Sequence, residues 1–134
     1  MNTFVLDASA AVAAFAENTS RGGRLLSRIS QADDIAVPGH FHAEVANALR
    51  GMERGGVVTA EALLGTLRDL SDLPVTEHRI VGPLLDRAVE LRANATVYDA
   101  LYVALAEQLE CGVVTVDGKL AAIPGLQCSV EVFA

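Results

Sequence analysis

The sequence is poor in cysteine, lysine and aromatic residues and has no long apolar run, and these shortages exclude several classes of protein. Its two cysteines, Cys111 and Cys128, lack CxxC spacing and are too few for a disulfide framework, so we expect small buried side chains at strand starts. No apolar run approaches the ~20 residues that cross a bilayer, and residues 1–4 lack the basic start of a secretion signal. We therefore expect a cytoplasmic protein without membrane association.

Positive charge is also scarce. The chain has 10 Lys and Arg against 17 Asp and Glu, a formal net charge of −7, which argues against a general basic surface for nucleic acid. A cluster of acids that bound a divalent cation would nevertheless attract phosphate locally. Nine of the ten basic residues are arginines, whose guanidinium group binds phosphate in a bidentate manner that lysine cannot match. Arginines in surface ion pairs would account for this composition equally well.

The remaining pattern predicts one α/β domain spanning residues 1–134. Hydrophobic residues make up 51% of the chain, enough for a substantial core. Short apolar runs alternate with helical periodicity, which predicts a mostly parallel sheet of about five strands covered by helices on both faces, a three-layer α/β/α fold. We predict strands at 4–6, 33–39, 73–76, 111–116 and 128–133, helices at 8–15, 24–30, 40–54, 59–70, 80–92, from 96 onward and within 117–122, and a loop at 18–23.

Four acids stand out by position within these elements. Asp7 and Asp117 each follow a strand, and Glu44 and Asp99 lie near the starts of helices. In open parallel sheets, ligands bind beyond the carboxyl ends of the strands. If the two strands are neighbours, the four carboxylates converge, and their mutual repulsion then requires a cation. Oxygen ligands without Cys or His favour Mg²⁺ or Mn²⁺.

Each acid also has a simpler interpretation. Asp7 could cap the helix that follows it, and Asp99 completes the capping-box pattern Thr96-x-x-Asp99. Asp117 with the following glycine could form only a turn, and Glu44 could be a first-turn acid favoured by the helix dipole. These interpretations are compatible with metal binding, because a helix N-terminus stabilises an anionic ligand.

Four stretches carry a resemblance to a known family. They are VLDAS at 5–9, AEVANAL at 43–49, YDALYVALA at 98–106 and VTVDGKL at 114–120. In this order and spacing the sequence resembles PIN-domain ribonucleases, and more closely the VapC-type toxins of bacterial toxin–antitoxin pairs. The resemblance spans essentially the whole chain.

The resemblance implies roles for seven residues. It implies that four acids bind Mg²⁺, with Mn²⁺ able to substitute, and that three polar residues support the site. The acids are Asp7, Glu44, Asp99 and Asp117, and the supporting residues are Ser9, Asn47 and Thr115. Gly118 and Lys119 stand where some members carry a further acid.

The resemblance also implies a function. It implies metal-dependent cleavage of RNA phosphodiester bonds, a homodimer and a cognate VapB-type antitoxin that covers the acids. A non-catalytic PIN-like module that binds RNA or protein is the main alternative, and such a module would be expected to have lost one of the acids. With two Tyr, four Phe and no Trp, no platform for stacking nucleobases is evident. An Asp-x-Asp phosphatase is disfavoured by Ser9, and residues 75–77 lack the phosphoacceptor aspartate that a receiver domain carries after its third strand.

Overall fold

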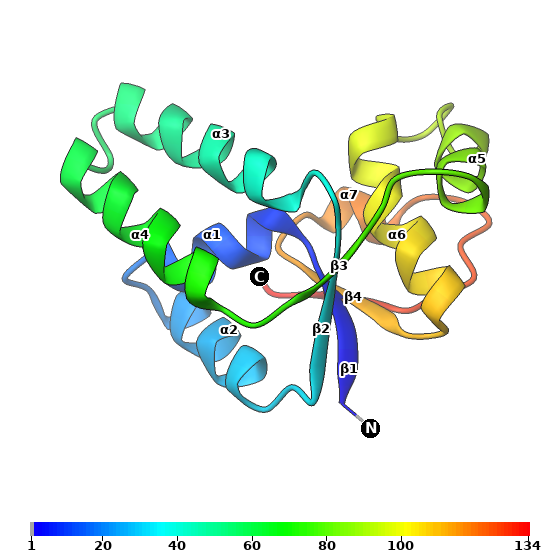
Figure 1. Ribbon diagram of the computed structural model, residues 1–134, viewed down its shortest axis with the longest axis horizontal. Helices are drawn as coiled ribbons and strands as arrows, with labels where there is room; N and C mark the ends of the chain where they lie inside the picture. Colours follow the sequence, from blue (N-terminus) through cyan, green and yellow to red (C-terminus); the bar gives the residue numbers. More distant parts are fainter. Residues whose placement is uncertain (1) are drawn as a thin grey trace.

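The computed structural model describes residues 2–134 and shows a parallel sheet between two layers of helices. Helices α1 to α4 lie on one side of the sheet and α5 and α6 on the other (Figure 1). This confirms the predicted three-layer α/β/α fold. The elements are β1 (Thr3–Leu6), α1 (Ala8–Ala16), α2 (Ser20–Ser30), β2 (Asp34–Pro38), α3 (Phe41–Arg54), α4 (Ala60–Asp72), β3 (Thr76–His78), α5 (Pro83–Glu90), α6 (Val97–Leu109), β4 (Gly112–Thr115), α7 (Gly118–Ala121) and β5 (Val130–Val132).

The sheet is built outward from β1. Its strand order is β3-β2-β1-β4-β5, and every neighbouring pair is parallel. Val5 is in register with Ala36 of β2 on one side and with Val113 of β4 on the other. The chain therefore runs outward from β1 first in one direction and then in the other. This reversal creates a crevice at the carboxyl ends of β1 and β4, where open α/β sheets bind ligands.

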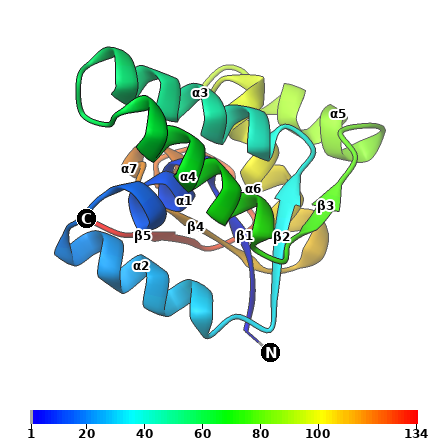
Figure 2. The ribbon, with the colours of Figure 1, turned by 60° about the vertical axis from the view of Figure 1, so that its left-hand side comes forward.

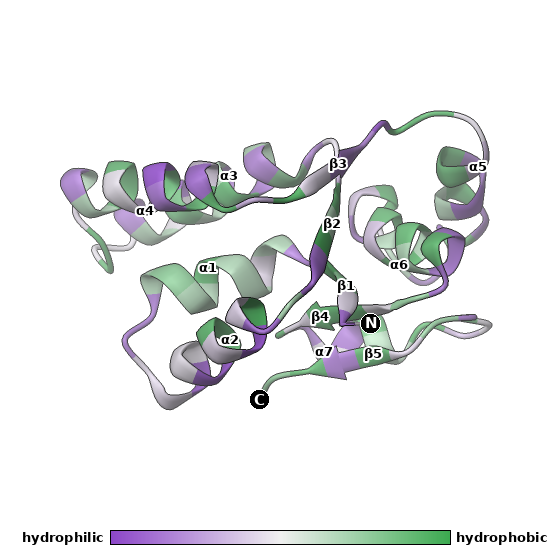
Figure 3. Ribbon diagram, turned by 60° about the horizontal axis from the view of Figure 1, so that its bottom comes forward, coloured by the Kyte–Doolittle hydropathy of each residue, from purple (hydrophilic) through white to green (hydrophobic). Residues whose placement is uncertain are grey.

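The central strands and the two helices beside them form the core. Strands β1 and β4 are buried because helices cover both faces of the sheet, which explains their continuous apolar sequence. Helix α6 packs on β1, β2 and β4, and every residue from Ala100 to Ala106 is buried. Figure 3 shows the apolar character of α1 and α6 against the mixed surfaces of α3 and α4. The prediction of a helix buried on most sides is confirmed.

The prediction of a loop at residues 18–23 is correct for residues 18 and 19 and wrong from Ser20 onward. Helix α2 begins at Ser20, and the hydroxyl of Thr19 caps it by accepting a hydrogen bond of 3.0 Å from the Gly22 amide. A Cβ atom at Gly22 would lie 2.8 Å from the carbonyl oxygen of Ala13 and 2.7 Å from that of Glu17. Gly22 therefore serves the close approach of α1 and α2, which local sequence does not reveal.

The third strand and the helix after it are also displaced from their predicted positions. Strand β3 covers Thr76–His78, whereas we predicted 73–76, because Leu73 still closes α4 and Pro74 has no amide hydrogen for the ladder. Helix α5 covers Pro83–Glu90 and not 80–92. Gly82, at φ 62°, immediately precedes it, and Pro83 occupies its first turn, as the fixed φ of proline favours.

Helices α3 and α4 form an antiparallel pair over α1 (Figure 2). Phe41, Val45 and Leu49 are the buried residues of α3, at the spacing of a helix that buries a single face. Glu44 lies beside this buried face, in the first turn of α3. Because α3 begins at Phe41, shortly after β2 ends at Pro38, its N-terminal end lies at the carboxyl edge of the sheet, beside the crevice.

Two predictions made from composition concern the burial of the cysteines and the absence of a membrane-spanning helix. Cys111 and Cys128 are free thiols just before β4 and β5, and both are partly buried where we expected full burial. Within residues 2–134, none of the helices combines the length and the hydropathy required of a membrane span.

Candidate active site

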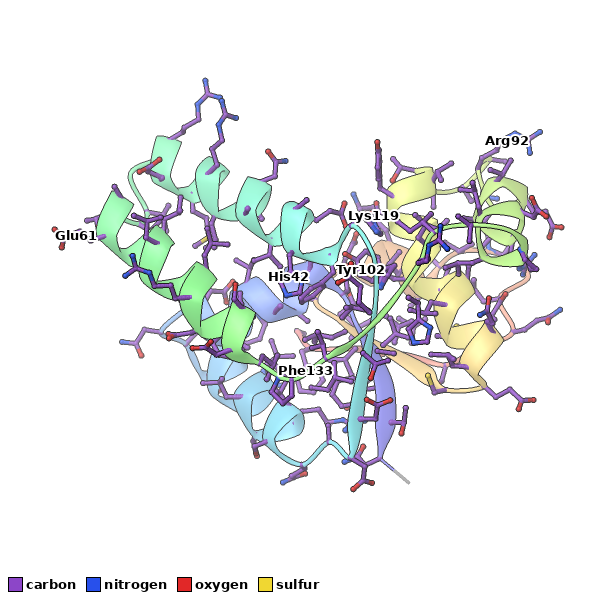
Figure 4. The ribbon with its side chains drawn as sticks, viewed as in Figure 1. His42, Glu61, Arg92, Tyr102, Lys119 and Phe133 are labelled. Atoms are coloured by element: carbon purple, nitrogen blue, oxygen red, sulfur yellow. The ribbon has the colours of Figure 1, made fainter. Side chains whose placement is uncertain are left out.

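All four predicted acids line one cavity at the carboxyl ends of β1 and β4. The cavity has a volume of about 490 Å³ and lies between the first turns of α3 and α6. Figure 4 shows Tyr102 in the region where α6 faces α3. Among the predicted supporting residues, Ser9 and Asn47 line the cavity, whereas Thr115 is fully buried and reaches it through Asp7. The convergence expected from neighbouring strands is therefore present.

Asp7 is the most buried of the four acids, with a relative exposure of 6%. It precedes α1, but its side chain does not cap that helix. Its Oδ2 instead accepts hydrogen bonds of 2.7 Å from Ser9 and 2.6 Å from Thr115. Burial raises the pKa of Asp7; the two hydroxyls oppose this rise, and the negative charges of Asp99 and Glu44 add to it.

Thr115 joins the ends of the two central strands. Its hydroxyl donates to Asp7 at the end of β1 and accepts a 2.9 Å hydrogen bond from the backbone amide of Asp117, which follows β4. The hydroxyl of Ser9 lies 3.2 Å away from that of Thr115. The backbone amide of Asp7 also donates a 3.0 Å hydrogen bond to the carbonyl oxygen of Val114. The register between β1 and β4 therefore sets the backbone positions of Asp7 and Asp117.

Asp117 and Asp99 each lie at the start of a helix. Oδ1 of Asp117 accepts a 3.0 Å hydrogen bond from the backbone amide of Lys119, so this acid does cap the short helix α7. At α6 the cap is Thr96, whose hydroxyl accepts from the backbone amide of Asp99 at 3.1 Å. The Asp99 pKa is raised by burial and by the charges of Glu44 and Asp117.

Glu44 is held by two side chains that sequence analysis did not single out. Its Oε1 accepts a 2.7 Å hydrogen bond from the hydroxyl of Tyr102 on α6 and lies 3.1 Å from Nε2 of His40. Burial acts to raise the pKa of Glu44, but the hydrogen bonds from His40 and Tyr102 outweigh it and lower the pKa. Glu44 therefore stays ionised, with Oε1 occupied and Oε2 left for a ligand.

The contacts of His40 assign its tautomer. Its Nε2 lies 2.9 Å from the carbonyl oxygen of Tyr98 as well as 3.1 Å from the carboxylate of Glu44, and both partners can only accept. Nε2 must therefore carry the proton. Within residues 2–134, Nδ1 is buried without a hydrogen-bond partner. A signal was present in the sequence, because His40 precedes Glu44 by four positions and so shares its helix face.

The residues around the cavity suit a hard divalent cation. Four carboxylates surround it, two have raised pKa values, and no Lys or Arg from residues 2–134 lines it. Within the same residues, no three Asp, Glu, His or Cys side chains are grouped tightly enough to hold an ion as they stand. An ion such as Mg²⁺, which is bound through one or two carboxylates and keeps several waters, matches such an open set of oxygen ligands.

Comparison with known proteins shows the family of this chain. The family model for the PIN domain matches residues 4–126. Ribonuclease VapC9 of Mycobacterium tuberculosis is 39% identical over 131 residues, with 96% of each chain covered, and ribonuclease VapC12 of the same species is 37% identical over 131 residues, covering 97% of this chain and 98% of that protein.

The same fold occurs in solved structures. VapBC2 from Rickettsia felis, crystallised with a DNA fragment from its promoter, superposes with a TM-score of 0.68 at 16% identity, covering 96% of this chain and 98% of that chain. The family model and the two M. tuberculosis relatives each extend over most of this chain. The chain therefore belongs to the PIN domain family and, within it, to the VapC ribonucleases.

Proposed function

We propose that this protein is an Mg²⁺-dependent endoribonuclease, with Mn²⁺ able to substitute, which cleaves RNA phosphodiester bonds. One observation carries the proposal: the switch point of the sheet brings Asp7 and Asp117 into the cavity that Glu44 and Asp99 also line. Membership of the VapC ribonucleases supports the same activity.

The chemistry follows from the charges in the cavity. When bound, a divalent ion attracts the scissile phosphate, activates water for attack and stabilises the charge that develops on the leaving oxygen. Asp7, Asp99 and Asp117 are the residues that would hold the ion, directly or through its bound waters. Ser9 and Thr115 hold Asp7 in place through Oδ2, which leaves its Oδ1 for the ligand. Glu44, restrained through Oε1, presents its other oxygen to orient water.

Substitution of two acids tests the activity. We expect Asp7→Asn and Asp99→Asn to lower Mg²⁺-dependent RNA cleavage at least about 100-fold, because each removes a negative oxygen from the cation site while conserving shape. Cleavage of a fluorophore-quencher RNA by the purified proteins, with and without a chelator, measures this.

The matched control is Asp69→Asn, which changes an exposed acid of α4 in the same way and should leave cleavage unchanged. Urea denaturation confirms that each variant folds. Parental cleavage rates in folded Asp7→Asn and Asp99→Asn would exclude the assignment.

A non-catalytic binding module is the less favoured function. All four acids are present, and they line one cavity together with Ser9 and Asn47. Burial and mutual charge raise the pKa values of Asp7 and Asp99, a cost that a binding module would have no reason to keep. Cleavage that rises as Mn²⁺ is titrated into metal-free protein distinguishes the enzyme from the module.

We further propose that the protein is the toxin of a toxin–antitoxin pair and forms a homodimer neutralised by a VapB-type antitoxin. The fold shared with VapBC2 supports the pairing. An acidic cavity without Lys or Arg among its described lining residues would accept an arginine of the partner in place of the cation. Co-expression with the product of the adjacent small gene should give a complex that does not cleave RNA. Light scattering that shows a monomer, with no complex formed, would contradict this proposal.

A further inference from the structure

One aromatic side chain differs from all the others in its exposure. Tyr98 is 64% exposed. The remaining Phe and Tyr side chains are buried or packed against the core: Phe4, Phe15, Phe41, Tyr102 and Phe133. Sequence analysis did not identify a stacking platform, because the exposure of a side chain depends on the tertiary structure. Folding does not account for Tyr98, since a ring mostly in water contributes little to the core.

Tyr98 lies at the candidate active site. It is in the first turn of α6, immediately before Asp99, and it lines the same cavity as the four acids. A tyrosine ring combines an apolar face with a polar tip, a chemistry suited to a surface that is covered only when a ligand binds. The expected ligand at the acids is a phosphodiester, so the next group along it is a nucleoside.

The position of Tyr98 is fixed by His40. The Nε2–H group of His40 donates to the carbonyl oxygen of Tyr98 at 2.9 Å, and the two rings lie 5.8 Å apart at an interplanar angle of 38°. His40 also packs against Tyr102, with ring centroids 5.1 Å apart. A chain of three rings therefore leads from the core to the surface. A side chain supported in this way loses less conformational freedom on binding.

We propose that Tyr98 is a stacking subsite for an unpaired nucleobase adjacent to the scissile phosphate. The proposal rests on the ribonuclease function given above. A base within a duplex is already stacked on its neighbours, whereas an unpaired base can cover an aromatic ring. Stacking of one base is sequence-tolerant, and its loss corresponds to roughly 5- to 150-fold weaker binding.

The test compares two substitutions on a single-stranded RNA of mixed sequence whose cut site has been mapped. Tyr98→Phe keeps the ring and should stay within about 2-fold of the parent. Tyr98→Leu keeps apolar bulk without a flat face and should raise KM roughly 5- to 150-fold, with a smaller change in kcat. Val81→Ala, at a 53% exposed apolar residue outside the cavity lining, is the matched control and should change neither constant.

An abasic substrate separates stacking from a structural effect. Removal of the base that stacks on Tyr98 should raise the KM of the parent by the same factor as Tyr98→Leu does on the intact RNA. On this abasic RNA, Tyr98→Leu should then raise KM no further. We would scan the nucleotides on both sides of the cut. If Tyr98→Leu is equally harmful on every abasic substrate, or harmless on the intact one, the subsite does not exist.

Two further outcomes would also overturn the proposal. If Tyr98→Leu leaves RNA kinetics unchanged but weakens the complex with the antitoxin, the exposed ring binds protein and not a nucleobase. If the parental protein itself does not cleave RNA with Mg²⁺, the proposed function fails, and the subsite fails with it. A cleaving parent with an insensitive Tyr98 rejects the subsite alone.

Discussion

The two halves of the cavity are built in different ways. Asp7 and Asp117 follow neighbouring parallel strands, and one buried hydroxyl, that of Thr115, contacts both residues. Glu44 and Asp99 lie in the first turns of α3 and α6. Among the described residues, every hydrogen bond that joins the start of α3 to α6 involves His40 or Tyr102.

This difference shows which half depends on backbone and which on side chains. A ladder register is fixed by many backbone hydrogen bonds, so the strand half is placed as soon as β1 pairs with β4. The helix half instead depends on two side chains that join the start of α3 to α6, His40 and Tyr102. We therefore expect substitutions in the strand half to affect both stability and activity, and those in the helix half to affect mainly activity.

Among the substitutions that test this difference between the two halves, Thr115→Val should have the largest effect. This change keeps the shape of a fully buried side chain but removes the hydroxyl that contacts Asp7 and the amide of Asp117. We expect cleavage to fall about 10- to 100-fold and the free energy of unfolding to fall by about 1–3 kcal/mol. Cleavage kinetics and urea denaturation measure the two effects.

Two controls sharpen this comparison. Thr115→Ser retains the hydroxyl and should recover much of the activity. Asn47→Ala changes another supporting residue predicted from the sequence, one whose exposed side chain lines the cavity but makes no hydrogen bond to another described residue. It should lower cleavage less than Thr115→Val does, by about 2-fold, because its side chain holds none of the four acids in place. Equal losses in Thr115→Val and Asn47→Ala would remove the proposed difference between the halves.

A smaller effect is expected for Tyr102→Phe. The variant retains the buried ring but loses the O–H group that donates to Glu44, so we expect roughly 10-fold slower cleavage with a stability change of about 0.5–1.5 kcal/mol. Because Tyr102 acts through Glu44, the substitution should add nothing in a Glu44→Gln background. Additive losses in the double variant would show that Tyr102 acts by another route.

The smallest effect concerns stability and pH. Burial raises the pKa of Asp7 in the folded protein above the unfolded value of about 3.9. The resulting stability is present below pH ~3.9 and is lost as the pH rises through the folded pKa. In chelator, Asp7→Asn should therefore gain stability relative to the parent between pH 4 and pH 7. The urea midpoints of the parent and of Asp7→Asn at pH 4 and at pH 7 test this. If the difference between the two proteins is the same at both pH values, the predicted direction of the pKa shift of Asp7 is wrong.

Local patterns were enough to predict much of the site and fold. The apolar run before Asp7 and the helical spacing around Glu44 are short-range features, so they placed these acids at element ends correctly. The same reasoning failed at Gly22, which reads as a loop residue but permits the contact of α1 with α2. It also failed at β3, an edge strand whose limits depend on pairing with β2.

The sequence by itself determined the elements and which residue types end them, because periodicity, caps and breakers act over a few residues. Only the tertiary structure decided the strand order that brings Asp7 beside Asp117, the support of Glu44 by Tyr102, and the exposure of Tyr98. The physical reason is separation along the chain: Glu44 and Tyr102 are 58 positions apart and Asp7 and Thr115 are 108 apart. Contacts between residues so far apart along the chain arise from the packing of whole elements, and local sequence patterns do not predict that packing.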